Sequence, residues 1–274
     1  MLISFHPSLA GGQLRSWTEM VRVAGAAGFA AVDLPLPEVH RDGVRRTRDL
    51  LAEAGVEVGG VRLPVEFRAD ERTFEEGLAA LPALAGFAAG VGARVMCRSV
   101  PPSAHLPRQE VLPTIRRRLG LCASVLDAVG MKLGLEFHSP LHLRRARPHE
   151  VLWRMDETLS FARSCGENVG LLLDSWHWHH AGAGTADILA AGGDILHVEV
   201  ADAADLDPED VRDDERLLPG RGVVDLDGFF TALGTIGYRG LVTPEVFGYT
   251  APGTPVDAAR VALEAVRLAS RDAA

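Results

Sequence analysis

Long apolar runs and basic charge are both scarce in this chain. No stretch reaches the ~20 apolar residues that a membrane span needs, and the amino terminus, Met1 to Pro7, has neither a basic region nor a long apolar segment. These absences predict a cytosolic protein with no membrane partner. Acidic residues outnumber basic ones by 37 to 28, which gives a formal charge of -9. A nucleic-acid partner is not expected, because phosphate binding needs a basic face, and a small solute is the better prediction.

Cysteine is also sparse. The three cysteines, Cys97, Cys122 and Cys165, are scattered and lack metal-ligand spacing, so we expect reduced, mostly buried thiols, none of them a nucleophile. No proline-rich linker, low-complexity tract or break in composition divides the 274 residues, of which 47% are apolar. The sequence therefore predicts one domain over residues 1–274.

One pattern recurs along the chain: an amphipathic helix, a glycine and a short apolar strand. It occurs at residues 24–34, 54–58, 92–96, 130–136, 170–174, 193–197 and 237–242, and residues 2–5 supply an opening strand. Glycine suits these positions because it can take the left-handed backbone at a helix end. Apolar strands that alternate with helices indicate parallel strands covered on both faces. Eight such units predict an α/β fold, a single (β/α)8 TIM barrel with its active site at the carboxyl ends of the strands.

Four acidic residues each close one of the later apolar runs: Glu136, Asp174, Glu199 and Glu245. Any one of them could merely cap the helix that follows. Four in consecutive units indicate a site instead, because the carboxyl ends of barrel strands converge on one axial point. Coming from the fifth to eighth strands, these acids can reach one ion. Four oxygen ligands without a thiolate favour Mn²⁺ or Mg²⁺ over Zn²⁺, and Co²⁺ becomes an option if His197 or His177 takes part.

The seventh strand offers two ligands, because His197 and Glu199 are two residues apart and point the same way. We favour Glu199 and keep His197 as the alternative. A divalent ion that bridges two oxygens of a hydroxy-ketone would polarise the carbonyl and acidify the neighbouring C–H bond. We expect Glu136 and Glu245 to be the acid–base pair, one removing that proton and the other returning it; the alternative is metal ligation without proton transfer.

An ordered series of motifs carries a family resemblance. It consists of Leu135-Glu136-Phe137, Asp174-Ser175-Trp176-His177, His197-Val198-Glu199-Val200-Ala201-Asp202 and Pro219-Gly220-Arg221-Gly222. Over nearly its whole length the chain resembles the xylose isomerase-like sugar phosphate isomerase/epimerase superfamily. For members of the ketose 3-epimerase kind, the resemblance implies a Glu, Asp, His, Glu metal set, matched here by Glu136, Asp174, Glu199 and Glu245.

The third of these positions is a departure, since relatives usually have His, or Gln in hydroxypyruvate-isomerase-like members. A fourth carboxylate should strengthen metal binding and weaken the ion as a Lewis acid. The resemblance also implies that His177 binds a substrate hydroxyl and that Arg216 contacts the substrate; a surface salt bridge is the alternative for Arg216.

Further pocket residues are expected from the amino-terminal half and from the histidines. His6, Arg62 and Arg98 close the first, third and fourth strands, and His138 follows Glu136. The two arginines could bind a substrate carboxylate or phosphate through bidentate bonds, or could pair with surplus carboxylates of the site. Trp176 and Trp178 offer aromatic faces to a sugar ring, whereas His179 and His180 are expected at a solvated helix start. The polar segment 201–222 should be a solvated loop or a lid on the catalytic face.

The expected function is isomerisation or epimerisation of a keto-sugar or sugar phosphate through an enediolate, with a small-molecule carbohydrate or cyclitol as partner. A metal-dependent dehydratase of an inosose or 3-dehydroshikimate type is the alternative, because the same enolate could expel a β-hydroxyl. A C-glycoside-cleaving subunit and a metal-free sugar-binding barrel stay open. A DNA-repair endonuclease is disfavoured, because arginines stand where it would need histidines. A homodimer or tetramer is expected from the resemblance alone.

Overall fold

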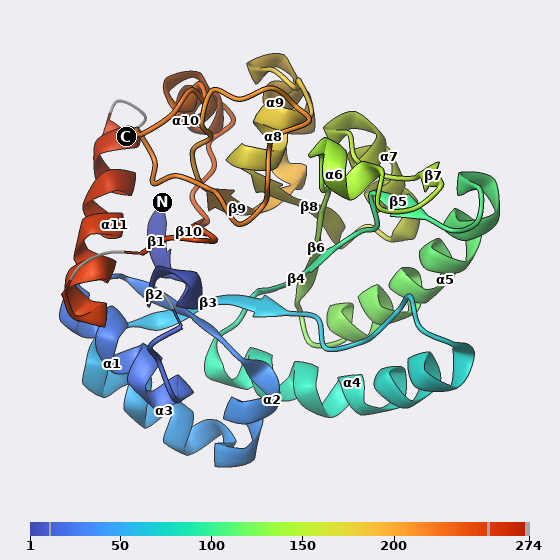
Figure 1. Ribbon diagram of the computed structural model, residues 1–274. Coiled ribbons are helices and arrows are strands. Elements are labelled where there is room, and N and C mark those ends of the chain that lie inside the picture. The colour runs from blue at the N-terminus through green and yellow to red at the C-terminus, as the bar shows by residue number, and fades with distance from the viewer. Residues whose placement is uncertain (11, 251–252, 272–274) are drawn as a thin grey trace.

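Eight parallel strands close into a barrel in the computed structural model, which describes residues 1–10, 12–250 and 253–271. The predicted (β/α)8 architecture is confirmed (Figure 1). Around the barrel the order is β1-β10-β9-β8-β6-β4-β3-β2. The barrel strands are β1 (Leu2–Phe5), β2 (Ala31–Leu34), β3 (Glu57–Arg62), β4 (Val95–Ser99), β6 (Lys132–Glu136), β8 (Val169–Asp174), β9 (Ile195–Val200) and β10 (Leu241–Pro244).

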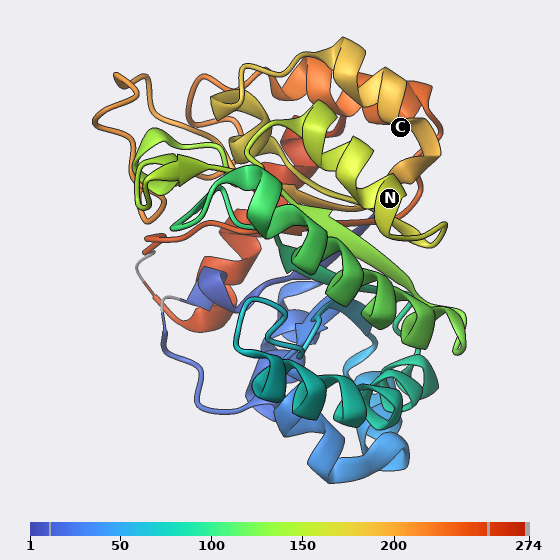
Figure 2. The same ribbon diagram turned by 90° about the vertical axis from the view of Figure 1, so that its right-hand side faces the viewer.

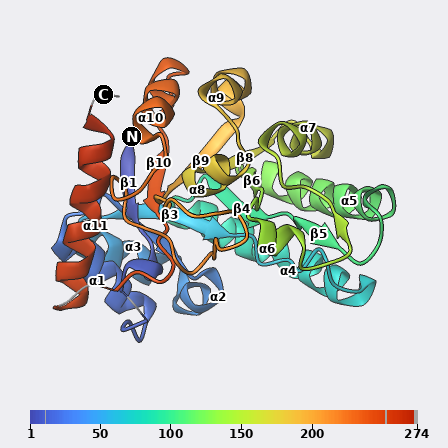
Figure 3. The same cartoon turned by 45° about the horizontal axis from the view of Figure 1, so that its top comes forward.

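Helices surround the strands (Figure 3). The long ones are α1 (Trp17–Ala27), α3 (Gly43–Ala54), α4 (Glu71–Val91), α5 (Arg108–Asp127), α7 (Met155–Cys165), α10 (Leu226–Thr235) and α11 (Pro255–Ala269). Shorter ones are α2 (Leu36–Val39), α6 (Leu141–Arg144), α8 (Ser175–His180) and α9 (Thr185–Ala191), with 3-10 turns at Pro7–Ala10, His40–Asp42 and Gly192–Asp194. The apolar faces of the helices and both faces of the strands together form the core.

Local sequence explains where these helices begin and end. Ser16 caps α1 by accepting a hydrogen bond from the backbone N–H of Glu19. Gly28 ends the same helix with φ 92°, and Gly92 ends α4 with φ 110°. Because this backbone conformation is strained for residues with a Cβ, glycine is the residue that suits the ends of these two helices.

Most of the additional structure lies at the end of the barrel where the strands have their carboxyl ends. Strands β5 (Ser103–Ala104) and β7 (His149–Glu150) form a small antiparallel pair, and it lies near the orange loop that follows β9 (Figure 2). That loop, the polar segment 201–222, is built around Asp202, which is buried and accepts hydrogen bonds from the backbone of Ala203, Gly222 and Val224. Asp202 also pairs with Leu217 through the backbone. The segment is therefore an ordered part of the face formed by the carboxyl ends of the strands and more than a solvated loop.

Helix α4 qualifies the expectation that no segment suits a membrane. By length and composition alone, its 21 residues could cross one. This is weak evidence, because core helices have the same properties. Here α4 packs beside α3 and α5, and its face with Phe74, Leu81 and Ala88 is buried.

Candidate active site

The four acidic residues predicted from the strand ends lie together. Glu136 ends β6, Asp174 ends β8, Glu199 lies in β9, and Glu245 directly follows β10. One oxygen from each carboxylate is within 4.8 Å of one oxygen of every other. These four strands are successive neighbours in the barrel, so the fold converts a pattern spread over 110 residues into one cluster.

Burial makes this cluster electrostatically costly unless cations compensate for it. Desolvation raises the pKa of Glu199 well above its usual range, and the charges of Glu245, Glu136 and Asp174 add to the shift. Burial likewise raises the pKa of Glu245 and Asp174, while the Arg216 guanidinium opposes both shifts. Like charges brought together out of water favour protonation or a bound cation. The cluster has the donor set that a divalent ion requires.

Arg216 supplies one cation from the loop after β9. Its Nη1 donates to Asp174 Oδ2 at 2.7 Å and to Glu245 Oε2 at 3.0 Å, and its Nη2 donates to Asp213 Oδ1 at 2.7 Å. The residue is 4% exposed and lies over the Trp176 and Phe247 rings. These carboxylates outweigh desolvation and raise its pKa further. The alternative of a surface salt bridge is therefore wrong for Arg216.

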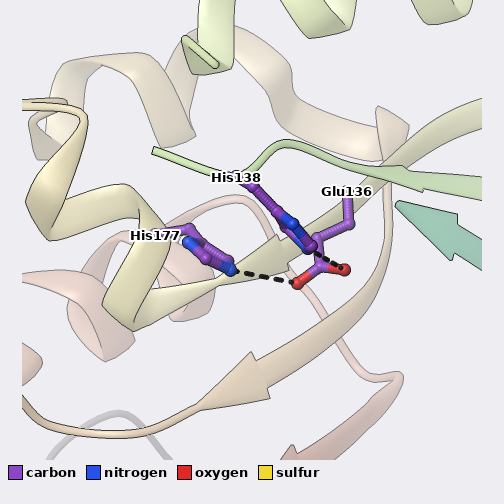
Figure 4. A group of neighbouring side chains, drawn as sticks. All are labelled: Glu136, His138 and His177. Atoms are coloured by element: carbon purple, nitrogen blue, oxygen red, sulfur yellow. Dashed lines mark ion pairs between the residues drawn. The ribbon is translucent and has the colours of Figure 1, made fainter. Parts of the chain in front are cut away.

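A second group shares Glu136 with the first. His138 Nε2 lies 3.1 Å from Glu136 Oε2, and His177 Nε2 lies 3.6 Å from Oε1, so both rings approach one carboxylate (Figure 4). The two imidazoles stack with centroids 4.5 Å apart. Burial disfavours the His138 cation, but the Glu136 carboxylate outweighs it and raises the pKa of His138. His177 is fully buried, which lowers its pKa well below the usual range. These three residues could also ligate a metal ion.

The two candidates on β9 are separated by the structure. Glu199 belongs to the four-carboxylate group, whereas His197 is in neither group of potential ligands among the described residues. His197 Nε2 lies 3.2 Å from Thr243 Oγ1, and burial lowers the pKa of His197 to about 4. His197 nevertheless lines the cavity together with Glu199.

The cavity has a volume of about 720 Å³ and is lined from both halves of the chain. Its walls include six of the seven predicted substrate-binding residues: His6, Arg62, Arg98, His138, His197 and Arg216. The seventh, His177, lies behind them against Glu136. His6 Nε2 lies 3.6 Å from Glu245 Oε1, and desolvation lowers the pKa of His6 to about 4.

Arg98 does not pair with the surplus carboxylates of the cluster. Its Nη2 donates to both Glu66 oxygens, at 2.7 and 2.6 Å, and its Nη1 reaches the Leu63 carbonyl at 3.4 Å. Glu66 lies in the segment after β3, where the sequence pattern gave no sign of a partner. This pairing rules out the interpretation that Arg98 neutralises the surplus carboxylates of the site.

The aromatic run after Asp174 is a further correction. Trp176 and Trp178 are 1% and 3% exposed, and Trp178 packs edge-to-face on Phe229 in the core. They therefore offer no free face to a sugar ring. His179 and His180 lie at the end of α8, not at its start, and are only partly exposed. Arg216 from the loop after β9 lies over the Trp176 ring, and Phe229 of α10 packs against Trp178. A local pattern cannot show such contacts.

Three acids of the cavity wall were missed, among them Glu38 in α2. Asp33 in β2 and Asp213 in the loop after β9 both line the cavity. A single polar residue inside the apolar run Ala31–Leu34 was the available signal for Asp33. Asp213 stands among many acidic residues of a polar segment, so its sequence carried no signal.

Comparison with known proteins agrees with this fold. The family model described as xylose isomerase-like TIM barrel matches residues 21–269. A xylose isomerase domain protein from Alicyclobacillus acidocaldarius superposes with a TM-score of 0.92 at 30% identity, covering 100% of this chain and 99% of that one. A D-psicose 3-epimerase from Clostridium cellulolyticum H10 superposes with a TM-score of 0.79 at 15% identity over 98% of this chain and 99% of that one, which indicates the shared fold alone.

An inosose isomerase of Bacillus subtilis is 28% identical over 127 residues. The matched segment covers 46% of this chain and 43% of that relative, so the chain spans less than half of the relative's length. The family match extends over nearly the whole barrel. The chain belongs to the xylose isomerase-like TIM barrel family.

Proposed function

We propose that this protein is a divalent-metal-dependent isomerase or epimerase of a polyhydroxylated ketone, a keto-sugar or a cyclitol ketone. The observation that carries the proposal is the cluster of Glu136, Asp174, Glu199 and Glu245, whose oxygens lie within 4.8 Å of one another at the carboxyl ends of the strands. The similarity to an inosose isomerase supports the same reaction class.

The residues fit a divalent ion. Glu136 Oε1 is buried and has no hydrogen-bond partner among residues that the structure describes, which leaves its lone pairs available. Glu136, Asp174, Glu199 and Glu245 would hold the ion, and Mn²⁺ or Mg²⁺ suits four carboxylates better than Zn²⁺ or Co²⁺. When bound, such an ion polarises a substrate carbonyl and stabilises negative charge on the neighbouring oxygens.

In this proposal Glu136 and Glu245 transfer the protons. Their strands β6 and β10 are separated in the barrel by β8 and β9, so the two carboxylates enter the cavity from different sides. Glu136 Oε2 lies beside His138, and Glu245 Oε1 lies beside His6. In the proposed reaction one glutamate removes the proton next to the carbonyl, and the other returns a proton to the enediolate. His138 and His177 hold Glu136 in place, and Arg216 orients Glu245 with its 3.0 Å hydrogen bond.

The test is proton–deuterium exchange in D₂O with D-fructose, D-psicose and 2-keto-myo-inositol, using the metal-loaded protein and the variants Glu136→Gln and Glu245→Gln. General acid–base catalysis predicts a loss of about 10²-fold or more in exchange for each variant. Glu53→Gln, on an exposed part of α3, is the matched control and should exchange as the parent does.

Product mass separates the alternatives. An isomerase or epimerase conserves the mass of its substrate, whereas a dehydratase releases one water. If Glu136→Gln and Glu245→Gln bind Mn²⁺ more weakly but exchange as the parent does once saturated with Mn²⁺, the two glutamates ligate the metal without transferring a proton. If the metal-loaded parent neither exchanges protons of these ketones nor converts them, the proposed reaction is contradicted.

A further inference from the structure

A second acidic position faces the cavity from the strands β1 to β3, outside the metal cluster. Asp33 Oδ1 accepts a hydrogen bond from Ser4 Oγ at 2.5 Å and one from the Gly60 backbone N–H at 2.6 Å. Among the described residues, Asp33 Oδ2 has no hydrogen-bond partner, and Asp33 is part of the cavity wall. One oxygen is thus fixed by the protein, and the other is left for a ligand.

The backbone is shaped around this carboxylate. Strand β2 pairs Val32 with Val58 but Leu34 with Val61, so β3 carries one additional residue at this point. Gly59 and Gly60 therefore stand opposite Asp33 in a β-bulge. Bulges next to active sites re-aim side chains, and glycine in a strand often marks a close approach. A Cβ on Gly60 would lie 2.8 Å from Asp33 Oδ2, and one on Gly59 would overlap Ser4 Oγ.

The charges around the cavity disfavour an anionic ligand beside Asp33. The guanidinium of Arg98 is committed to Glu66, and that of Arg216 is committed to Asp174, Asp213 and Glu245. Arg15 and Arg62 also line the cavity, but their side chains are exposed to solvent. A carboxylate with an open oxygen repels phosphate and accepts a hydrogen bond from a hydroxyl group.

We propose that Asp33 is a hydroxyl-binding and specificity-determining residue, which holds the part of an uncharged polyol that lies away from the metal cluster. The Gly59–Gly60 bulge positions its carboxylate for this role. The inference deepens the proposed function, on which it rests for the identity of the substrate, because it requires a free hydroxyl rather than a phosphate on the part of the substrate beside Asp33.

Binding of myo-inositol to the metal-loaded protein, measured by calorimetry, tests this assignment without turnover, because myo-inositol has no carbonyl. Hydrogen bonds to charged groups are strong enough that Asp33→Asn should weaken binding by about tenfold or more. Gly60→Ala keeps the charge but forces Asp33 Oδ2 to move, so it should weaken binding as well. Asp49→Asn, which removes an equal charge from the exposed face of α3, should bind as the parent does.

Parent-like affinity in Asp33→Asn, an equal loss in Asp49→Asn, or no binding of myo-inositol by the parent would each overturn the assignment. The exchange assay keeps the two proposals distinguishable. If the parent exchanges protons of D-fructose while Asp33→Asn retains its KM, the role of Asp33 is wrong and the proposed reaction stands. If the parent binds myo-inositol and Asp33→Asn binds it more weakly, but no ketone exchanges its protons for deuterium, the role of Asp33 in polyol binding stands and the proposed reaction is wrong. A rise in KM for D-fructose with kcat nearly unchanged is the expected signature of a binding role.

Discussion

At the scale of single residues, Glu199 is the most consequential position, because its carboxylate stands where the resemblance implies a histidine. Replacing Glu199 by His removes one negative charge from the cluster and adds a borderline nitrogen ligand. We expect Glu199→His to shift preference from Mn²⁺ toward Zn²⁺, with Mn²⁺ affinity reduced about tenfold or more. Competition with a fluorescent chelator measures both affinities.

The control for this change is Glu53→His on α3, which should leave both metal affinities as they are. Unchanged Mn²⁺ and Zn²⁺ affinities in Glu199→His would mean that Glu199 is no ligand. In that case the group of Glu136, His138 and His177 would become the better candidate metal centre.

His180, a residue outside the cluster, is expected to contribute to the loss of stability in acid. Burial, aided by His179, lowers the pKa of His180 to about 4 in the folded protein. The unfolded chain therefore binds more protons on this ring between pH 6.5 and about 4, and its contribution to stability falls as the pH falls through that window. His180→Phe keeps an aromatic contact with Trp176 but cannot be protonated.

Urea denaturation at several pH values tests this expectation. The free energy of unfolding of His180→Phe, relative to the parent, should increase steadily from pH 7 down to pH 4 and stay level above pH 7. His105→Phe, at an exposed position, should show no such trend. Parallel curves for His180→Phe and the parent would contradict the prediction.

At the scale of elements, close packing between helices depends on single glycines. A Cβ on Gly25 of α1 would overlap the carbonyl oxygen of Ala54, where α3 ends. Gly25→Ala must push the two helices apart, and overpacking of this kind costs about 1–3 kcal/mol. We expect the free energy of unfolding to fall by that amount in chemical denaturation.

Gly86 in α4 is the matched control, since a Cβ there meets no atom within 4 Å. Gly86→Ala should stabilise the protein by up to about 1 kcal/mol, because alanine has the higher helix propensity. Equal effects of the two substitutions would show that helix propensity, and not the contact between α1 and α3, decides the outcome.

At the scale of the whole molecule, the carboxylate cluster couples metal binding to the stability of the barrel. Its four carboxylates lie at the ends of four neighbouring strands, so an ion that they bind only in the folded state would stabilise the closed arrangement. At 100 times the dissociation constant this linkage supplies about 2.7 kcal/mol. For a chain of this size, removal of the metal should lower the Tm by roughly 5–10 °C.

Thermal unfolding with Mn²⁺ and with a chelator measures this difference. Asp174→Asn should abolish it, because Asp174 is fully buried within the cluster. An equal metal-dependent shift in the parent and in Asp174→Asn would place the ion elsewhere.

The sequence by itself determined the barrel and the cluster of acids. Glycine at the helix ends and apolar strands fix the repeating unit locally, and closure of eight units brings their strand ends together. That is why Glu136, Asp174, Glu199 and Glu245 could be named before their distances were known. The three cysteines are unpaired thiols, as predicted, but Cys122 alone of the three is fully buried, whereas mostly buried thiols were expected.

Only the tertiary structure decided what covers and what opposes these residues. Alternation along β9 left His197 and Glu199 equivalent, and the close approach of Glu199 to the other three carboxylates separated them. The path of the loop after β9 brings Arg216 onto the acids and buries Trp176, neither of which a local pattern encodes. In the sequence, Asp33 is one polar residue in an apolar strand. In the structure it lies opposite a bulge in the neighbouring strand, and its carboxylate lines the cavity. Periodicity specifies which face a residue takes within its own element, whereas contacts between distant segments depend on how those segments pack.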